Sequence, residues 1–297
     1  MTYSPVQEEW RRGWPVILAG LLGYGSASGF FIIASSLFIA PMQAELGWSA
    51  KQLTFLPIVV FLLAVFNPVA GILTDRWGAR RIVIVGLCLY SIGVVGMAIT
   101  PAKPYYLYAI AAFIGITAPL SSVSPVVKGV AGWFRLSSGT AFGLTLSGVS
   151  FISLIGMPLI NYAIHSFGWR SGYMVFAGLS LVIGLPAVVL GFREHPQACS
   201  APASSHPVLG GTHWREALRS TRFWSLFLAL FLTSAALGGF LGHLQPILAL
   251  KDFAVAQATI LGVVYAVSVL LGRLVGGFSL TGFPMESLLA HFWFCRQ

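Results

Sequence analysis

The sequence predicts an all-α membrane protein. Of its 297 residues, 57% are hydrophobic and only 8% are charged, and the mean hydropathy is +0.85. Such a composition excludes an ordinary water-soluble globular domain. Eight apolar runs have about the 20 residues that a helix needs to cross the hydrocarbon core. They are 14–41, 53–74, 82–100, 105–127, 140–164, 172–192, 223–248 and 258–280.

The basic residues between these runs predict the orientation of the chain. Loops on one side carry eleven of them and loops on the other side carry four. Because Lys and Arg gather in cytoplasmic loops, we expect a multi-pass protein of the cell membrane with a cytoplasmic N-terminus. Scattered in this way, the net charge of +9 does not indicate nucleic-acid binding. The eleven are Arg11, Arg12, Arg76, Arg80, Arg81, Lys128, Arg135, Arg193, Arg215, Arg219 and Arg222, and the four are Lys51, Lys103, Arg170 and Lys251.

A polar turn joins the second and third runs and has the sequence Gly71-Ile-Leu-Thr-Asp75-Arg-Trp-Gly78-Ala-Arg-Arg81. Gly71 permits a close helix contact, and Gly78 permits a tight turn. The pattern Gly-x-Leu-x-Asp-Arg-x-Gly-x-Arg-Arg resembles the loop between helices two and three of the major facilitator superfamily of transporters. This resemblance implies that the aspartate and the arginines lock the inward ends of two six-helix halves and release them as access alternates; a merely basic turn is the alternative. The predicted gating motif is Gly71, Leu73, Asp75, Arg76, Gly78, Arg80 and Arg81.

The fifth run opens with a second recognisable segment, 133–148. Its aromatic-Phe start and its small residues resemble the signature of the monocarboxylate transporter and oxalate/formate antiporter branch of the superfamily. We expect Gly143, Ser147 and Gly148 to serve close helix packing. The segment departs from the branch pattern where Leu136 and Ser137 replace the expected cations.

The remaining sequence predicts an unfinished second half. Residues 1–192 form the expected six-helix bundle, and 193–221 form a cytoplasmic linker with a surface helix at 214–224. Residues 222–280 supply the first two helices of a second bundle. In the register of the first half, Thr281 stands where a second Asp75 is expected, and 281–297 is an atypical tail. The chain thus resembles a twelve-span transporter truncated after about eight spans, for which a changed reading frame is one explanation.

Three residues are candidates for substrate binding. Arg273 is the only Lys or Arg well inside a run, where a cation normally faces a cavity and has a partner. The resembling antiporters carry an arginine here that binds the substrate carboxylate; the alternative is that Arg273 extends to the cytoplasmic surface. Tyr24 lies in the first run beside Gly25, and the first helix lines the cavity in this superfamily. His243, in the seventh run, could carry a proton or simply stabilise a polar spot near the outer mouth.

The predicted function is therefore transmembrane transport of small organic anions, monocarboxylates or dicarboxylates, by alternating access. The partners are the lipid bilayer and the anion, with either H⁺ or a counter-anion for coupling, and we expect no cofactor and no metal. We find no catalytic motif, so we do not expect an enzyme. The truncated form is expected to be incomplete and non-functional, and the competing hypothesis is a non-transporting remnant or accessory membrane protein.

Overall fold

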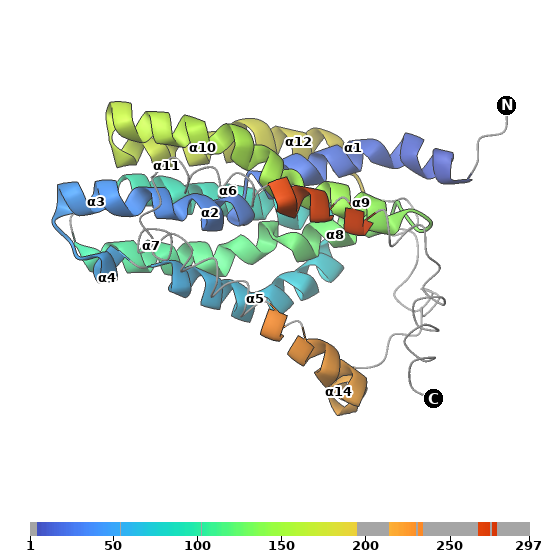
Figure 1. The fold of residues 1–297 in the computed structure, drawn as a ribbon. Coiled ribbons are helices and arrows are strands. Elements are labelled where there is room, and N and C mark those ends of the chain that lie inside the picture. Colours follow the sequence, from blue (N-terminus) through green and yellow to red (C-terminus); the bar gives the residue numbers. More distant parts are fainter. Residues whose placement is uncertain are drawn as a thin grey trace. The chain divides into compact units, whose positions relative to one another are not determined.

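The computed structural model describes residues 5–53, 55–101, 103–194, 214–229, 231–233, 267–273 and 275–277. Regular structure in these residues is helical, without a strand, which confirms the predicted all-α class (Figure 1). Six of the described helices are long and apolar enough to cross a membrane. They are Pro5–Ala34, Pro57–Trp77, Ala79–Ala98, Pro104–Ala131, Ser138–Phe167 and Trp169–Gly191. Most of the predicted seventh and eighth spans lies outside the described residues.

Several of the six spans consist of more than one element. Short breaks divide the first, fourth and fifth spans, and the sixth contains one π-helical segment, a feature often associated with functional sites. The elements are α1 (Pro5–Gly25), α2 (Ser28–Ala34), η1 (Ser35–Phe38), α3 (Ile39–Leu46), α4 (Ala50–Leu53), α5 (Leu56–Trp77), α6 (Ala79–Ala98), α7 (Pro104–Thr117), η2 (Ala118–Ser121), α8 (Val123–Ala131), α9 (Ser138–Leu146), α10 (Gly148–Phe167), α11 (Trp169–Gly178), η3 (Leu179–Gly184) and α12 (Leu185–Gly191).

The first helix begins earlier than the hydropathy indicates. The apolar run starts at Trp14, whereas α1 starts at Pro5. Its first two turns are polar and contain the ion pair between Glu8 and Arg12, 2.7 Å apart. Hydropathy detects only the part of a helix that lies in hydrocarbon, so a polar extension of the same helix is missed.

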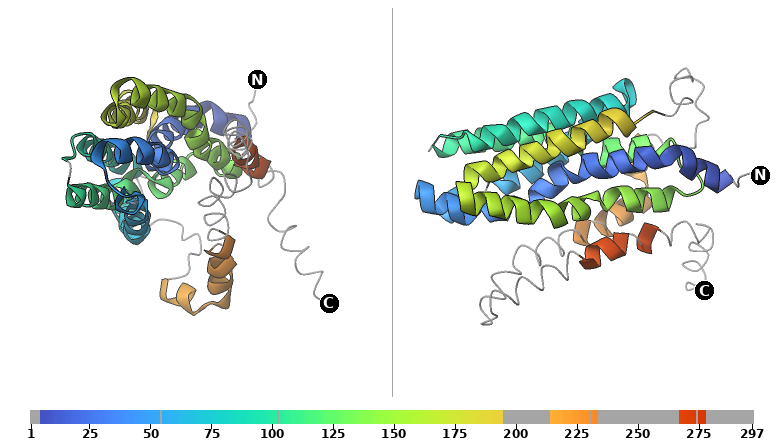
Figure 2. Two further views of the ribbon diagram at one scale, coloured as in Figure 1. Left: turned by 60° about the vertical axis from the view of Figure 1, so that its left-hand side comes forward. Right: turned by 90° about the horizontal axis from the view of Figure 1, so that it is seen from above.

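The six spans pack side by side around α1 and α6. In this bundle α1 contacts α9, α10 and α12, while α6 contacts α7 and α11 (Figure 2). One buried cluster lies toward the α3 end, where the rings of Phe38 and Tyr173 stack with centroids 4.0 Å apart. A second cluster lies toward the start of α1 and includes Val16, Phe134 and Phe192. Close packing within the bundle is therefore apolar along its length.

Many hydroxyl groups inside the bundle bond to their own helix, whereas the buried hydroxyls of Tyr90, Ser91 and Ser180 have no partner among the described residues. Apart from Tyr and Trp, the buried polar side chains among the described residues are serines and threonines. Thr74 donates to the Ala70 carbonyl at 2.6 Å, and Thr145 donates to the Ala141 carbonyl at 2.7 Å. Such bonds back to the preceding turn let a hydroxyl lie in a membrane helix without a partner on another helix.

The contacts divide the chain into two units, Met1–Cys199 with Val269–Gln297, and Ser200–Ser268. The six-span bundle belongs to the first unit. In the second unit, the described residues form α14 (Trp214–Arg219) and an apolar helix over Thr221–Thr233. The predicted surface helix at 214–224 thus covers α14 and the start of this next helix. The domain boundaries given above stay predictions.

Candidate functional site

The predicted loop between the second and third spans is a single residue. Helix α5 continues to Trp77, α6 starts at Ala79, and only Gly78 separates them. Gly78 has φ 84° and ψ 151°, a conformation that is essentially confined to glycine. Asp75 and Arg76 therefore project from the last turn of a helix rather than from a loop.

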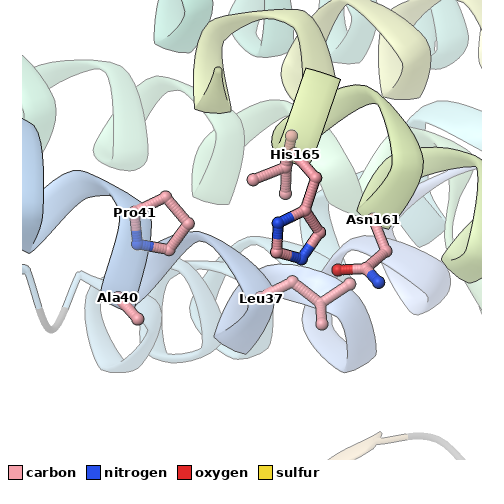
Figure 3. A pocket seen from close by; sticks show the side chains of 6 residues that line it. Leu37, Ala40, Pro41, Asn161 and His165 are labelled. Atoms are coloured by element: carbon pink, nitrogen blue, oxygen red, sulfur yellow. The ribbon is translucent and has the colours of Figure 1, made fainter. Parts of the chain in front are cut away.

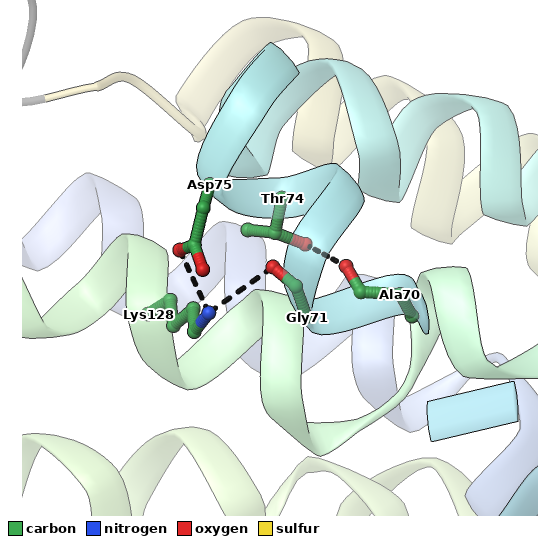
Figure 4. A network of polar contacts seen from close by, with 5 residues as sticks. All are labelled: Ala70, Gly71, Thr74, Asp75 and Lys128. Carbon is green, nitrogen blue, oxygen red and sulfur yellow. Dashed lines mark hydrogen bonds and ion pairs between the residues drawn. The ribbon is translucent and has the colours of Figure 1, made fainter. Parts of the chain in front are cut away.

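Asp75 pairs with a lysine of the fourth span. The Lys128 Nζ lies 2.7 Å from the Asp75 carboxylate and donates to the Gly71 carbonyl at 3.1 Å. Figure 4 shows the ammonium group between these two oxygens, with α5 on one side and α8 on the other. A lock to a second bundle was the implied role of Asp75, yet its partner in the structure belongs to the same six-span bundle. The contact joins the ends of α5 and α8.

The arginines of the motif differ in their contacts. Arg80 reaches from α6 to α12, where its Nη2 donates to the Val189 carbonyl at 2.7 Å. Arg76 and Arg81 are exposed, and Leu73 is partly buried. The turn is thus connected to the fourth span by Lys128 and to the sixth by Arg80.

We expect the Asp75–Lys128 pair to contribute little to stability. The two side chains are 67% and 41% exposed, and exposed ion pairs are worth about 1 kcal/mol or less. A double-mutant cycle with Asp75→Asn and Lys128→Met, measured as unfolding free energy in mixed detergent micelles, should give a coupling of at most about 1 kcal/mol. A coupling well above that value would make the pair a structural element and contradict a gating role.

The N-terminal extension of α1 is tied to the loop before α9. The Glu9 carboxylate accepts hydrogen bonds from the Arg135 and Leu136 N–H groups and from the Ser137 hydroxyl, each at 3.1 Å. Leu136 and Ser137 are the positions where the sequence lacks the expected cations. Their backbone and hydroxyl groups instead hold the start of the fifth span against the first.

A second group of predicted residues meets where the fifth span is interrupted. Helix α9 ends at Leu146, α10 starts at Gly148, and the Ser147 hydroxyl donates to the Leu144 carbonyl at 2.6 Å. The Leu146 carbonyl accepts a hydrogen bond from Arg273 Nη1 at 2.6 Å. The guanidinium is thus fixed by a backbone oxygen that the break makes available.

Tyr24 lies on α1 beside the same break. It is 8% exposed. The neighbouring Gly25 contacts Gly148, because a Cβ added at Gly25 would lie 2.7 Å from the Gly148 carbonyl carbon. Residues of the first and fifth spans therefore meet at the break where Arg273 binds.

Glycines bring Arg273 and Gly277 close to α9. A Cβ added at Gly143 would lie 2.7 Å from the Arg273 carbonyl oxygen and 3.2 Å from the Gly277 Cα. Thr140 also donates to the Gly277 carbonyl at 3.5 Å. Only glycine, which has no Cβ, allows the two backbones to come this close. This approach positions Arg273 next to Leu146.

The structure therefore brings most of the predicted residues to two places. Tyr24, Arg273, Gly143, Ser147 and Gly148 gather at the helix break, and the gating motif lies at the turn around Gly78. His243 lies outside the described residues. Sequence reasoning did not predict that Lys128 is the partner of Asp75. It did assign Lys128 to the same side of the membrane as the Asp75 turn, and this shared side was a signal that could have suggested the pair. Sequence reasoning also missed the Leu146 carbonyl, because no side chain marks a backbone acceptor.

No set of three His, Cys, Asp or Glu side chains with metal-binding geometry occurs in the part of the chain that the structure describes. The chemistry available at the helix break is instead hydrogen bonding. A guanidinium has five N–H donors, and the Leu146 carbonyl uses one of them. The other donors suit the planar oxygens of a carboxylate.

Comparison with known proteins gives matches over most of the chain. Residues 15–290 match the family model described as Major Facilitator Superfamily. Monocarboxylate transporter 2 of Mus musculus is 24% identical over 60% of this chain and 37% of its own length. Monocarboxylate transporter 6 of Homo sapiens is 27% identical over 66% of this chain and 40% of its own length. Monocarboxylate transporter 13 of Bos taurus is 25% identical over 93% of this chain and 63% of its own length. The chain thus spans less than two thirds of each of these relatives.

Proposed function

Because this chain belongs to the Major Facilitator Superfamily, we propose that it binds small monocarboxylates as part of an alternating-access carrier. The single observation that carries the proposal is the Arg273 guanidinium, held by the Leu146 carbonyl at the break in the fifth span. A cation inside a membrane protein is costly unless it has partners or faces water. The names of the relatives favour monocarboxylates over dicarboxylates as the substrate class.

In the proposed binding mode, two guanidinium N–H groups of Arg273 donate to the two oxygens of the anion. The bond to Leu146 fixes the orientation of the guanidinium before the anion arrives, so less side-chain entropy is lost on binding. The Tyr24 hydroxyl offers a further donor from the first span. Because the three groups come from different spans, their mutual distances change when the spans move, and this couples binding to access.

The turn around Gly78 supplies the proposed gate. Asp75 holds Lys128 on α8, and Arg80 holds α12. We propose that Asp75 exchanges Lys128 for a partner on a second bundle when the inward side closes. Exposed ion pairs are close to neutral in free energy, so such an exchange requires little energy. The basic residues around this turn support a cytoplasmic position for it and for the N-terminus.

The proposal is tested by measuring anion binding to the purified 297-residue chain in nanodiscs. Equilibrium dialysis with radiolabelled propionate should detect saturable binding, with propionamide as the isosteric neutral control. Charge-assisted hydrogen bonds contribute roughly 1.5–3 kcal/mol, so propionate should bind about 10- to 100-fold more tightly than propionamide. Equal binding of acid and amide, or no binding of either, would contradict the proposal.

The same sample in liposomes distinguishes a carrier from a binding protein. The described residues form one six-span bundle, whereas the transport path of this superfamily lies between two such bundles. We therefore propose that these 297 residues bind propionate without transporting it when they are reconstituted alone. Saturable uptake would contradict this second proposal. Its dependence on a pH gradient or on a preloaded counter-anion would then separate proton symport from anion exchange.

A further inference from the structure

A pocket at the other end of the bundle is not used by the proposed function. It is open, has a volume of about 420 Å³, and lies between the end of the first span and the last turns of the fifth. Both spans start at the end where Glu9 binds the 135–137 loop, so a full helix length separates the pocket from that end. The Gly78 turn lies at the Glu9 end too, because Asp75 binds Lys128 on α8, which leads into the 135–137 loop. The pocket therefore lies at the end of the bundle opposite the Gly78 turn. Its lining residues are Leu37, Ala40, Pro41, Asn161, Ile164 and His165.

The polar groups of this pocket come from one face of α10. Asn161 and His165 are four residues apart, so both side chains point the same way. Figure 3 shows the imidazole ring above Leu37, with the Asn161 amide beside it and Pro41 across the pocket. Both side chains are exposed. Neither has a hydrogen-bond partner among the residues that the structure describes, so their donors are available to a ligand.

The composition of the lining indicates which ligand fits. An imidazole N–H and an amide NH₂ both donate, and none of the six lining residues is acidic. The other four side chains, those of Leu37, Ala40, Pro41 and Ile164, offer only carbon. A ligand with an anionic head that accepts two hydrogen bonds and a short apolar body satisfies both parts. A cation would find no carboxylate in the lining.

We infer that this pocket is an outer binding site for small alkyl carboxylates, with Asn161 and His165 donating to the carboxylate and Leu37, Pro41 and Ile164 contacting the alkyl chain. The choice of a carboxylate rests on the proposed function, but the site is separate from Arg273. It would hold the anion at the face of the bundle opposite the gating turn. A concave site in which a few polar groups converge beside apolar side chains is typical of small-molecule sites.

The test places a reactive thiol in the pocket. In a background with Cys88, Cys199 and Cys295 replaced by serine, Ala40→Cys adds a thiol to an exposed lining position. Ala44→Cys is the matched control, one turn further along α3, exposed and outside the lining. The measured quantity is the rate of reaction with N-ethylmaleimide in nanodiscs, with and without butyrate. At about twice its Kd, butyrate should slow the Ala40→Cys reaction about threefold. It should leave Ala44→Cys unchanged, and butyramide should protect neither.

Adding Asn161→Leu and His165→Leu should abolish the protection of Ala40→Cys. If this double variant does not fold, the single variants Asn161→Ser and His165→Gln should each weaken it. The inference would be overturned by any of three results: butyrate still protects Ala40→Cys in these variants, it slows the N-ethylmaleimide reaction equally at both thiols, or it slows neither reaction. If butyrate does not protect Ala40→Cys but propionate binding still depends on Arg273, only the outer site is refuted. Protection of Ala40→Cys without any Arg273-dependent binding would remove only the proposed function.

Discussion

Replacing Gly148 by alanine should lower the free energy of unfolding by about 3 kcal/mol, in the upper part of the range for overpacked sites. Gly148 opens α10 at the break in the fifth span, and α1 crosses it in direct backbone contact. An added Cβ would lie 2.7 Å from the carbonyl carbon of Leu21 and 2.9 Å from its Cα. Because the obstacle is backbone, no side-chain rotation relieves the overlap, and α1 must move away from α10.

Gly178→Ala is the matched control for this prediction. Gly178 ends α11, and a Cβ added there would meet nothing within 4 Å. Alanine should be neutral there or stabilise by up to about 1 kcal/mol through its higher helix propensity. Both variants are compared by SDS-induced unfolding in mixed micelles, followed by tryptophan fluorescence. Similar effects at the two positions would show that the Gly148–Leu21 contact does not hold α1 to α10.

Replacing Arg273 by leucine should reduce propionate affinity about 100-fold, and Arg273→Lys should reduce it about tenfold. Lysine keeps the charge but provides a compact ammonium, which cannot bind a carboxylate in two places while also bonding to the Leu146 carbonyl. The expected losses correspond to roughly 2.7 and 1.4 kcal/mol of binding free energy. The measurement is the equilibrium dialysis described above, with the unfolding midpoint as a check on folding.

Arg12→Lys controls for the arginine-to-lysine change itself. Arg12 lies on the exposed start of α1 and pairs with Glu8, a contact that lysine can also make. Propionate affinity should be the same as in the unchanged chain. Unchanged affinity in both Arg273 variants would remove this residue from the binding site. Equal losses in Arg273→Lys and Arg273→Leu would show that charge alone is insufficient and that the planar guanidinium is required.

The two ends of the bundle differ in the chemistry they present. The end with Gly78 carries charged groups held by neighbouring helices, as in the contacts of Asp75 with Lys128 and of Arg80 with Val189. The other end carries the pocket with Asn161 and His165, and the ion pair of Arg170 with Glu45 lies on helices that start or end there. A charged end suits contacts that form and break, whereas a concave end suits capture of a small molecule.

The partners of the site residues could not be predicted because they are far apart in the sequence. Lys128 is 53 residues from Asp75, and Glu9 is 126 residues from Arg135. Each contact depends on which helices are neighbours and on how they are rotated about their axes. Hydropathy says which segments enter the membrane, but one apolar helix can pack against another in many ways.

The sequence by itself determined the membrane class, the six described spans, the glycine turn at position 78 and the family. These features depend on local patterns, namely apolar length, basic residues between runs and a backbone conformation that only glycine adopts readily. The tertiary structure alone decided that Asp75 binds Lys128, that the Leu146 carbonyl holds Arg273, and that Asn161 and His165 face a pocket. Such features require two helices to be neighbours, each with a particular rotation about its axis and a particular position along it. That geometry is fixed by packing across the whole bundle, and the close backbone approach of Gly148 to Leu21 on α1 is one example.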